Sequence, residues 1–475
     1  MTHFSFSKSE KPKLIDWLLL TIIILMSFFL FSQYGDIIIT AKHSMLLIDE
    51  TVKGRFFHYY NDIYQAAIAA HGSQGVVESP YYSIIIYMTF AIWSLPLWLF
   101  SHFSHLEIPD FTLMMWDKLL ILMVVLITTY VLYRISILLS MNRGKAKWVA
   151  FLFLSSPILL FGSIVFTQYD IFSCFFTLVA LYYFFEKKPY EFSAFMALAI
   201  CYKNFSAFIF LPLVLLMEKR VLHICKYYLI GFSLVVVHKL IFSQDPGYRA
   251  TQKALTKLYG FVSGVTGTGL TSVFGTIFFL GIAMVLACIF AYAKDIEKDE
   301  DLVQYGLYIP LFVYGIFFAF MGWHPQWVLI LVPYIVFCAV QHKNFKLSLF
   351  VDIALSVSYL FVSFDTYTNN VDQAMVNYGI LPKLFGVTYD SSLKLVDLVN
   401  RSGIPLNAFI TIFSSCIFAM LILFFPKIKA ERNETETLSV SFVPDRSVIW
   451  IRTLSILTYM APALALYFYH LFKIR

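Results

Sequence analysis

The chain has 475 residues, of which 60% are hydrophobic, 19% aromatic and 13% charged. Soluble domains carry about 25% charged residues, and fifty Phe with thirty Tyr would leave large apolar patches in water. Composition therefore excludes an ordinary soluble protein and indicates a membrane protein. The net charge of +6 does not indicate nucleic-acid binding, because the basic residues form short clusters between apolar runs. Such clusters hold loops on the cytoplasmic side of a membrane.

Apolar runs that suit transmembrane helices follow one another along the whole chain. They cover roughly 14–33, 82–101, 113–140, 148–167, 171–186, 192–217, 224–243, 271–293, 305–322, 327–341, 346–364, 405–425 and 448–470. Since a span needs about 20 mostly apolar residues, they predict an all-α polytopic fold with about 11–14 spans. The first run ends without a small-x-small cleavage site, which predicts an uncleaved span with its N-terminus inside. The six cysteines are scattered without a CxxC spacing, so neither a disulfide framework nor a zinc site is predicted.

The basic clusters predict which loops are cytoplasmic and which are outside. Clusters expected inside include 143–147, 186–188, 218–220, 342–346 and 427–429. Loops expected outside are 34–80, 167–170, 244–270, 323–326 and 365–404. Within the first of these, 37–70 is amphipathic and suits helices on the membrane surface.

One conflict stays open at the start of the chain. The N-terminus and 143–147 both favour the inside, yet three clear runs separate them. Either 109–140 holds two short crossings, or one segment is re-entrant near Pro96 or Pro109.

Asp36 follows the first apolar run directly. A carboxylate there can act as a general base on a hydroxyl group, or it can be an ordinary interfacial charge that ends a helix. Asp49 and Glu50 in the same loop compete for the role of base.

Two polar interruptions lie further along the apolar sequence. Thr167-Gln168-Tyr169-Asp170 is pinched between two runs, where it can bind a sugar or form a simple polar turn. Lys203 lies inside the run 192–217, which is either one span or two short half-helices divided at Tyr202-Lys203-Asn204. An intramembrane cation suits a phosphate or carboxylate partner, although a lysine can also extend its ammonium group to the interface.

Two outer segments complete the candidate residues. His324 and Gln326 lie between two tryptophans in a tight turn. This turn is either part of a functional site or part of an aromatic belt at the membrane interface. In the loop 244–270, Arg249, Lys253 and Lys257 are four residues apart, so a helix would place them on one face. Such a face on the outer side suits an anionic lipid headgroup.

These features together resemble the GT-C glycosyltransferases, multispanning enzymes that use polyprenyl-phosphate sugars as donors. The similarity covers roughly residues 14–341, and it depends on an ordered set of individually weak motifs. These are Asp36 with Thr40-Ala-Lys42-His43-Ser44, Gln168-Tyr169-Asp170, Tyr202-Lys203-Asn204 before Leu211-Pro212, and Trp323-His324-Pro325-Gln326. The chain lacks the WWD-type motif of the oligosaccharyltransferases.

The resemblance implies a role for each candidate residue. Asp36 would be the base that deprotonates the acceptor hydroxyl, with inversion at the anomeric carbon. The acceptor or sugar would be bound by Gln168, Asp170, His43 and Gln326. The donor phosphate would be held by Lys203, Arg249 and His324. No metal ion or other cofactor is implied. Residues 1–341 would form the catalytic module, and 342–475 would add C-terminal transmembrane helices.

An outward-facing transferase needs a membrane-anchored donor, because nucleotide sugars are absent outside the cell. The bias toward Phe, Ile, Tyr and Lys is typical of low-GC bacteria, so we expect an undecaprenyl-phosphate hexose as donor. A glycan or lipid of the cell envelope would be the acceptor, at the outer face of the plasma membrane, with envelope-biosynthesis proteins as possible partners. The alternatives are a flippase for lipid-linked sugars and a non-enzymatic scaffold of an envelope polysaccharide complex.

Overall fold

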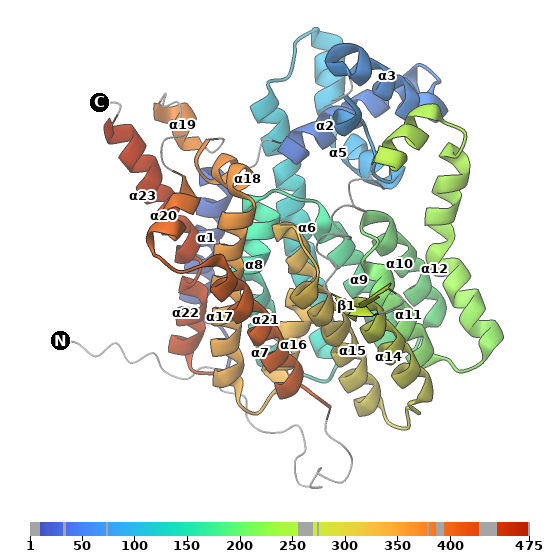
Figure 1. The fold of residues 1–475 in the computed structure, drawn as a ribbon, viewed down its shortest axis with the longest axis vertical. Helices are drawn as coiled ribbons and strands as arrows, with labels where there is room; N and C mark the ends of the chain where they lie inside the picture. The colour runs from blue at the N-terminus through green and yellow to red at the C-terminus, as the bar shows by residue number, and fades with distance from the viewer. Residues whose placement is uncertain are drawn as a thin grey trace.

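The computed structural model is a bundle of helices with one short β-hairpin (Figure 1). It describes residues 10–31, 35–72, 75–254, 269–272, 275–377, 380–385, 394–426 and 444–473. The elements of the first half are α1 (Leu14–Leu30), α2 (Gly35–Val52), η1 (Phe56–His58), α3 (Tyr59–His71), α4 (Gly75–Glu78), α5 (Ile84–Ser104), α6 (Asp110–Leu138), α7 (Arg143–Leu154), α8 (Pro157–Leu159), η3 (Leu160–Val165), α9 (Asp170–Phe185), α10 (Pro189–Tyr202), α11 (Ser206–Met217) and α12 (Val221–Phe242).

The second half begins with the hairpin and is otherwise helical. Its elements are β1 (Gly269–Ser272), β2 (Gly275–Phe278), α14 (Phe279–Ala293), α15 (Asp299–Phe320), η4 (Pro325–Leu331), α16 (Val332–Gln341), α17 (Phe345–Thr366), α18 (Thr368–Asp372), η5 (Gln373–Asn377), α19 (Ile380–Phe385), α20 (Leu395–Arg401), α21 (Leu406–Leu423), α22 (Arg446–Leu454) and α23 (Leu457–Lys473). The antiparallel strands pair Gly269 with Phe278 and Ser272 with Gly275. The predicted helical class is therefore confirmed, apart from this hairpin.

Seven helices in the described part of the chain are long and apolar enough to cross a membrane, or nine if each of two bent pairs counts as one span. This fits a polytopic membrane protein, but the predicted 11–14 spans are too many by this measure. The reason is that several apolar runs are broken into shorter helices. Ser156, for example, caps a new helix with Pro157 at its first position. The run 192–217 also divides at Lys203 into α10 and α11, as the half-helix alternative predicts.

The first basic cluster lies at the same end of the bundle as the start of α1. A Cβ atom on Gly144 would lie 2.5 Å from the carbonyl oxygen of Glu10. The same end holds Asp16 near the start of α1, whose carboxylate is paired with Arg446 at the start of α22. Asp36 lies beyond the other end of α1. The candidate base and the first basic cluster are therefore separated by the length of this helix.

Helix α5 lies at the same end of the molecule as α2 (Figure 1). It runs alongside α2, since Trp98 donates to Asp49 (2.8 Å) and the ring of Tyr87 lies 5.7 Å from that of His43. The next helix, α6, begins beside α2 as well, where Asp110 pairs with Lys42 (2.9 Å). Figure 1 shows α2, α3 and α5 gathered at one end of the molecule. Helices α2, α3 and α5 and the start of α6 therefore lie together, and α5 is itself one of the helices long and apolar enough to cross a membrane.

The core is built in two parts. One large apolar cluster runs through the bundle, and a smaller one joins α2, α3 and α5 to α12 and the segment after it. The smaller cluster is rich in buried tyrosines, among them Tyr59, Tyr60 and Tyr87. The region 37–70, predicted to be amphipathic helix, does form α2 and α3, and this cluster fixes both helices against the bundle.

Candidate active site

The turn 167–170 is shaped by an irregular stretch of backbone. It follows η3, a π-helical turn, and π-helical turns often occur at functional sites. Thr167 has φ of +54°, which is a strained conformation for a β-branched residue. Its hydroxyl donates to the carbonyl of Ile164 (3.2 Å). This hydrogen bond stabilises the strained backbone conformation of Thr167. The conformation in turn directs the polar side chains that follow into the bundle.

Gln168 reaches the candidate base across a long distance in sequence. Its side chain is buried, and its Nε2 donates to the Oδ2 of Asp36 (3.2 Å). Asp36 itself is half-buried at the start of α2. The two residues are 132 positions apart, so the contact exists only because α2 and the turn after η3 meet.

Asp170 and Lys203 form a buried ion pair. The ammonium of Lys203 lies 2.8 Å from the Oδ1 of Asp170, and the two side chains are 14% and 1% exposed. Lys203 follows the last residue of α10, and its extended backbone (φ −154°, ψ 119°) turns the chain between α10 and α11. Its ammonium also lies 5.1 Å from the ring centre of Trp327 and 5.7 Å from that of Phe205, where cation–π attraction adds to its binding.

These four residues make up one group, which we call the acid–lysine cluster: Asp36, Gln168, Asp170 and Lys203. Lys203 also interacts electrostatically with Asp36, so a single cation serves two carboxylates. The cluster thus holds two acidic side chains and one basic side chain. Such an arrangement can bind a hydroxyl or cationic group at the acids and an anionic group at the lysine.

The turn before η4 contributes the next residues. The imidazole of His324 lies 4.8 Å from the ring of Trp327 and 4.9 Å from that of Tyr367. Burial lowers the pKa of His324 to about 4, with Lys203 acting in the same direction. The imidazole is therefore neutral at neutral pH, and it would contact a phosphate by a hydrogen bond without adding a charge.

Gln326 follows His324 in the same turn and is buried. Its Oε1 has no hydrogen-bond partner among the described residues. The turn is packed closely on η3, because a Cβ atom on Gly162 would lie 3.2 Å from the Cα of Gln326. This places Gln326 against the irregular segment that leads to Gln168 and Asp170.

Two predicted site residues show no contact with the acid–lysine cluster in the described part of the structure. The carbonyl of His43 accepts from the hydroxyl of Tyr59 (3.2 Å), and its ring packs on Tyr87. Arg249 is exposed and donates to the carbonyl of Gln244 (3.4 Å). His43, in α2, therefore packs against α5. Arg249 lies on a helical segment, 246–254. Asp245, just before this segment, accepts from the backbone amide of Asn61 in α3 (3.2 Å). Lys257, the third residue of the predicted basic face, lies outside the described residues.

The two competing acids of the first outer loop are engaged elsewhere. Asp49 accepts from the indole of Trp98. Glu50 is buried and accepts two hydrogen bonds from Arg55, at 2.7 and 2.8 Å. Of Asp36, Asp49 and Glu50, Asp36 is therefore the one that belongs to the acid–lysine cluster.

Sequence reasoning missed Tyr82, which lies beside the cluster. Its ring packs edge-on against Tyr169 at 5.2 Å, the residue between Gln168 and Asp170, and it interacts electrostatically with Asp36. The backbone here is held firmly, since the Tyr60 hydroxyl donates to the carbonyl of Tyr82 (2.6 Å). The Tyr81-Tyr82 pair before a helix was the available signal, but aromatic residues are too common in this chain for the pair to stand out.

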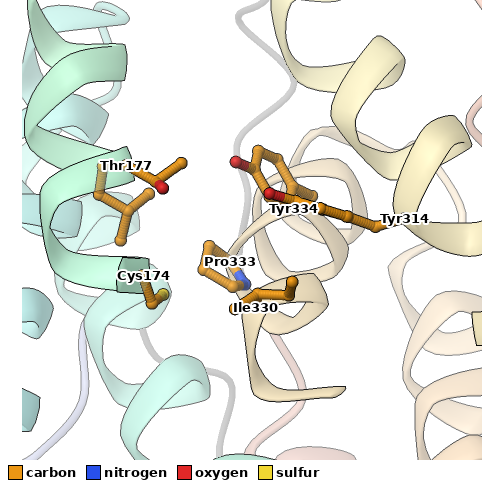
Figure 2. Close-up of a pocket in the computed structure, with 7 residues that line it drawn as sticks. Cys174, Thr177, Tyr314, Ile330, Pro333 and Tyr334 are labelled. Atoms are coloured by element: carbon orange, nitrogen blue, oxygen red, sulfur yellow. The ribbon is translucent and has the colours of Figure 1, made fainter. Parts of the chain in front are cut away.

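A hydroxyl-rich region lies next to the cluster inside the bundle. Ser206 hydrogen-bonds Ser173 (2.8 Å) and Thr177 (3.0 Å), one turn after Lys203. Figure 2 shows the neighbouring gap, into which the hydroxyls of Tyr314 and Tyr334 point from α15 and α16 toward α9. The gap is too narrow for a water molecule. It is therefore part of the packed core.

Within the described residues, no three His, Cys, Asp or Glu side chains gather in an arrangement that could hold a metal ion. Comparison with known proteins adds no relative: no family model, no curated protein and no solved structure matches this chain.

Proposed function

We propose that this protein is a membrane glycosyltransferase that moves a hexose from a polyprenyl-phosphate donor to an envelope acceptor. The observation that carries the proposal is the convergence of Asp36, Gln168, Asp170 and Lys203. They come from three separate parts of an otherwise apolar chain. Buried polar groups in a membrane protein are costly and commonly mark functional sites.

In the proposed reaction, Asp36 removes the proton of the acceptor hydroxyl as its oxygen attacks the anomeric carbon. The bond between that carbon and the phosphate oxygen breaks, and the polyprenyl phosphate leaves with the electron pair. The configuration at the anomeric carbon is inverted. Gln168 holds the Asp36 carboxylate in one orientation, so that the base is positioned before the acceptor arrives.

Lys203 is the residue proposed to bind the donor phosphate. Its side chain is 14% exposed and its ammonium already interacts with two acids, so an arriving phosphate would compete with Asp170 for it. His324 and Gln326 would add neutral hydrogen bonds around the same group. In this proposal, donor binding loosens the ion pair of Asp170 and leaves its carboxylate available to the acceptor.

The proposed site faces the outside of the plasma membrane. In support, Asp36 lies at the end of α1 opposite to the basic segment beside Gly144, and basic segments remain cytoplasmic. A polyprenyl-linked donor is available at the outer face, whereas a nucleotide sugar is not.

Transfer can be tested with the purified full-length protein in nanodiscs. Synthetic undecaprenyl-phosphate hexoses carrying a radiolabelled sugar are supplied with cell envelopes as acceptor, and label in the glycan fraction is measured. We expect transfer by the wild type and a loss of about 10²–10⁴-fold for Asp36→Asn, the usual contribution of a general base. Asp49→Asn is the matched control, because an amide oxygen can still accept from Trp98.

Each alternative function has its own outcome in this experiment. Sugar translocation into sealed vesicles without transfer would identify a flippase. Neither transfer nor translocation, with normal envelope assembly by Asp36→Asn cells, would identify a scaffold. Transfer by Asp36→Asn at the wild-type rate would remove Asp36 from the role of base.

A further inference from the structure

A fully buried lysine lies where α1 ends. Lys118 is in α6, with its side chain 0% exposed. Its ammonium donates to the carbonyl oxygens of Phe28 (2.6 Å) and Phe31. It also lies 5.1 Å from the ring centre of Phe28.

These contacts satisfy the end of a helix. The last carbonyls of an α-helix have no partner within the helix, and they carry the negative end of its dipole, which favours a cation. Leu30 is the last residue of α1 and Phe31 its cap. Lys118 therefore closes the C-terminal end of α1 from a neighbouring helix.

The charge of Lys118 is not used in an ion pair within the described residues. The adjacent acid, Asp117, accepts instead from the hydroxyl of Ser94 (3.1 Å). A buried cation without a carboxylate partner is expensive in a membrane protein, and a neutral residue would pack in α6 more favourably. The two hydrogen bonds to backbone carbonyls are thus the polar contacts that account for a lysine at this buried position.

The site of these bonds lies next to the candidate base in the chain. Helix α2 begins at Gly35, its axis is bent by 75° from that of α1, and Asp36 is its second residue. A change in where α1 ends would move the start of α2 and the Asp36 carboxylate with it. Misplacement of a reacting group by about 1 Å can slow a reaction roughly 10²-fold.

We propose that Lys118 is a positioning residue for Asp36: it fixes the end of α1 and so sets the orientation of the base toward Gln168 and the acceptor. This inference rests on the proposed transferase function. It predicts that Lys118 acts on the chemical step through Asp36, whereas donor binding at Lys203 stays as it is.

The test is a double-mutant cycle in the transfer assay with undecaprenyl-phosphate hexoses. Lys118→Met should lower kcat about 10–100-fold with little change in the KM for the donor. In the Asp36→Asn background, Lys118→Met should lower the rate by less than about twofold, because the base it positions is already gone. A merely structural role would lower the rate by the same factor in both backgrounds, and that result would overturn the proposal.

Asp117→Asn is the matched control, since it changes the neighbouring buried side chain of α6 and keeps an acceptor for Ser94. It should leave kcat within about twofold of the wild type. If Lys118→Met does not accumulate as a folded protein, Lys118→Gln retains a donor amide without the charge and enters the same cycle. We expect Lys118→Gln to retain more activity than Lys118→Met, and wild-type activity in Lys118→Met contradicts the proposal.

A second measurement separates this inference from the proposed function. Amide hydrogen exchange over residues 27–40 should be faster in Lys118→Met than in both the wild type and Asp117→Asn. If the wild type transfers no sugar, the proposed function fails while this measurement still tests Lys118. Unchanged exchange across 27–40 would show that Lys118 does not fix the end of α1.

Discussion

Both ends of this bundle contain buried charged side chains, but the two ends differ in how completely those side chains are paired. At the end with the basic segment, Asp16 accepts from Arg446 (2.5 and 3.2 Å), from the indole of Trp450 (2.9 Å) and from the backbone amide of Lys13 (2.7 Å). At the opposite end, Lys203 serves both Asp36 and Asp170. In the first network the acid has several donors of its own. In the second, two acids share one lysine.

A second matched pair strengthens the contrast. Arg452, 1% exposed, pairs with Asp352 at 2.8 Å and donates to the Leu152 carbonyl and the Ser155 hydroxyl, both at 2.7 Å. We call these residues with Asp16, Arg446 and Trp450 the α22 clamp. Figure 1 shows α22 beside α1 and α17. The clamp ties α22 to helices from both halves of the chain.

The difference between the two ends separates structural charges from functional ones. A buried network in which every group has a partner stabilises one packing and has little left to offer a ligand. A network with an excess acid and an orphan oxygen on Gln326 is less stable alone and gains partners when a substrate binds. Functional sites are commonly the places where a protein leaves some buried polar groups without a partner.

The largest effect is expected from breaking the α22 clamp. Arg452→Met leaves Asp352 buried without its cation, which should reduce the free energy of unfolding by about 3–5 kcal/mol. Thermal unfolding of the protein in nanodiscs measures the loss. Lys187→Met is the control: Lys187 pairs with Asp299 on the surface, where both side chains are more than half exposed, so its effect should be about 0–1 kcal/mol. Equal effects of the two variants would contradict the comparison.

The same substitution at the other end should mainly affect activity. Lys203→Met removes the cation shared by two acids, and transfer should fall on the order of 100-fold, as for loss of one group that stabilises developing charge. The KM for the donor should rise in parallel. Thermal stability should fall less than for Arg452→Met, because Asp170 lies at the N-terminus of α9, where the helix dipole favours a negative charge. A larger loss of stability at Lys203 than at Arg452 would reverse the assignment of the two ends.

The smallest effect concerns Asp372 in the stretch after α17. Burial raises the pKa of Asp372 from 3.8 to about 6, although the Leu395 amide bonded to it acts in the opposite direction. The folded protein therefore binds this proton more tightly than the unfolded chain. The stabilisation is complete below about pH 4 and is lost as the pH rises through about 6, by at most about 1.4 kcal/mol per pH unit.

Asp372→Asn should accordingly raise the melting temperature by a few degrees at pH 7.5 and leave it unchanged near pH 4. Asn can still accept from the Leu395 amide, so the hydrogen bond at 3.0 Å is retained. Asp365→Asn, in the last turn of α17, is the control. A stability difference that does not vary with pH would show that the Asp372 carboxyl group is not the source.

Much of the acid–lysine cluster could be predicted because polar residues are conspicuous in an apolar sequence. Asp36, Gln168, Asp170 and Lys203 each interrupt or border an apolar run. Arg249 was singled out by the same reasoning, yet it shows no contact with the cluster in the described residues. Spacing along a loop gives the face of a helix, but it does not say what that face packs against.

Other polar residues were hidden within apolar runs. Asp117 and Lys118 lie in 113–140 and Asp352 in 346–364, where the average over a window of about 20 residues remains apolar. Their partners are distant in sequence: Lys118 bonds the carbonyl of Phe28, 90 positions away, and Arg452 bonds Asp352, 100 positions away. A hydropathy average cannot anticipate a partner that folding brings to such a residue.

The sequence by itself determined that this is a helical membrane protein with polar residues at a few interruptions, because hydropathy and charge act locally along the chain. The tertiary structure decided which interruptions meet and that α5 packs alongside α2. Those outcomes depend on contacts between segments distant in sequence: Gln168 and Asp36 are 132 positions apart, and Trp98 and Asp49 are 49 positions apart. Packing selects these contacts only when the whole bundle is assembled.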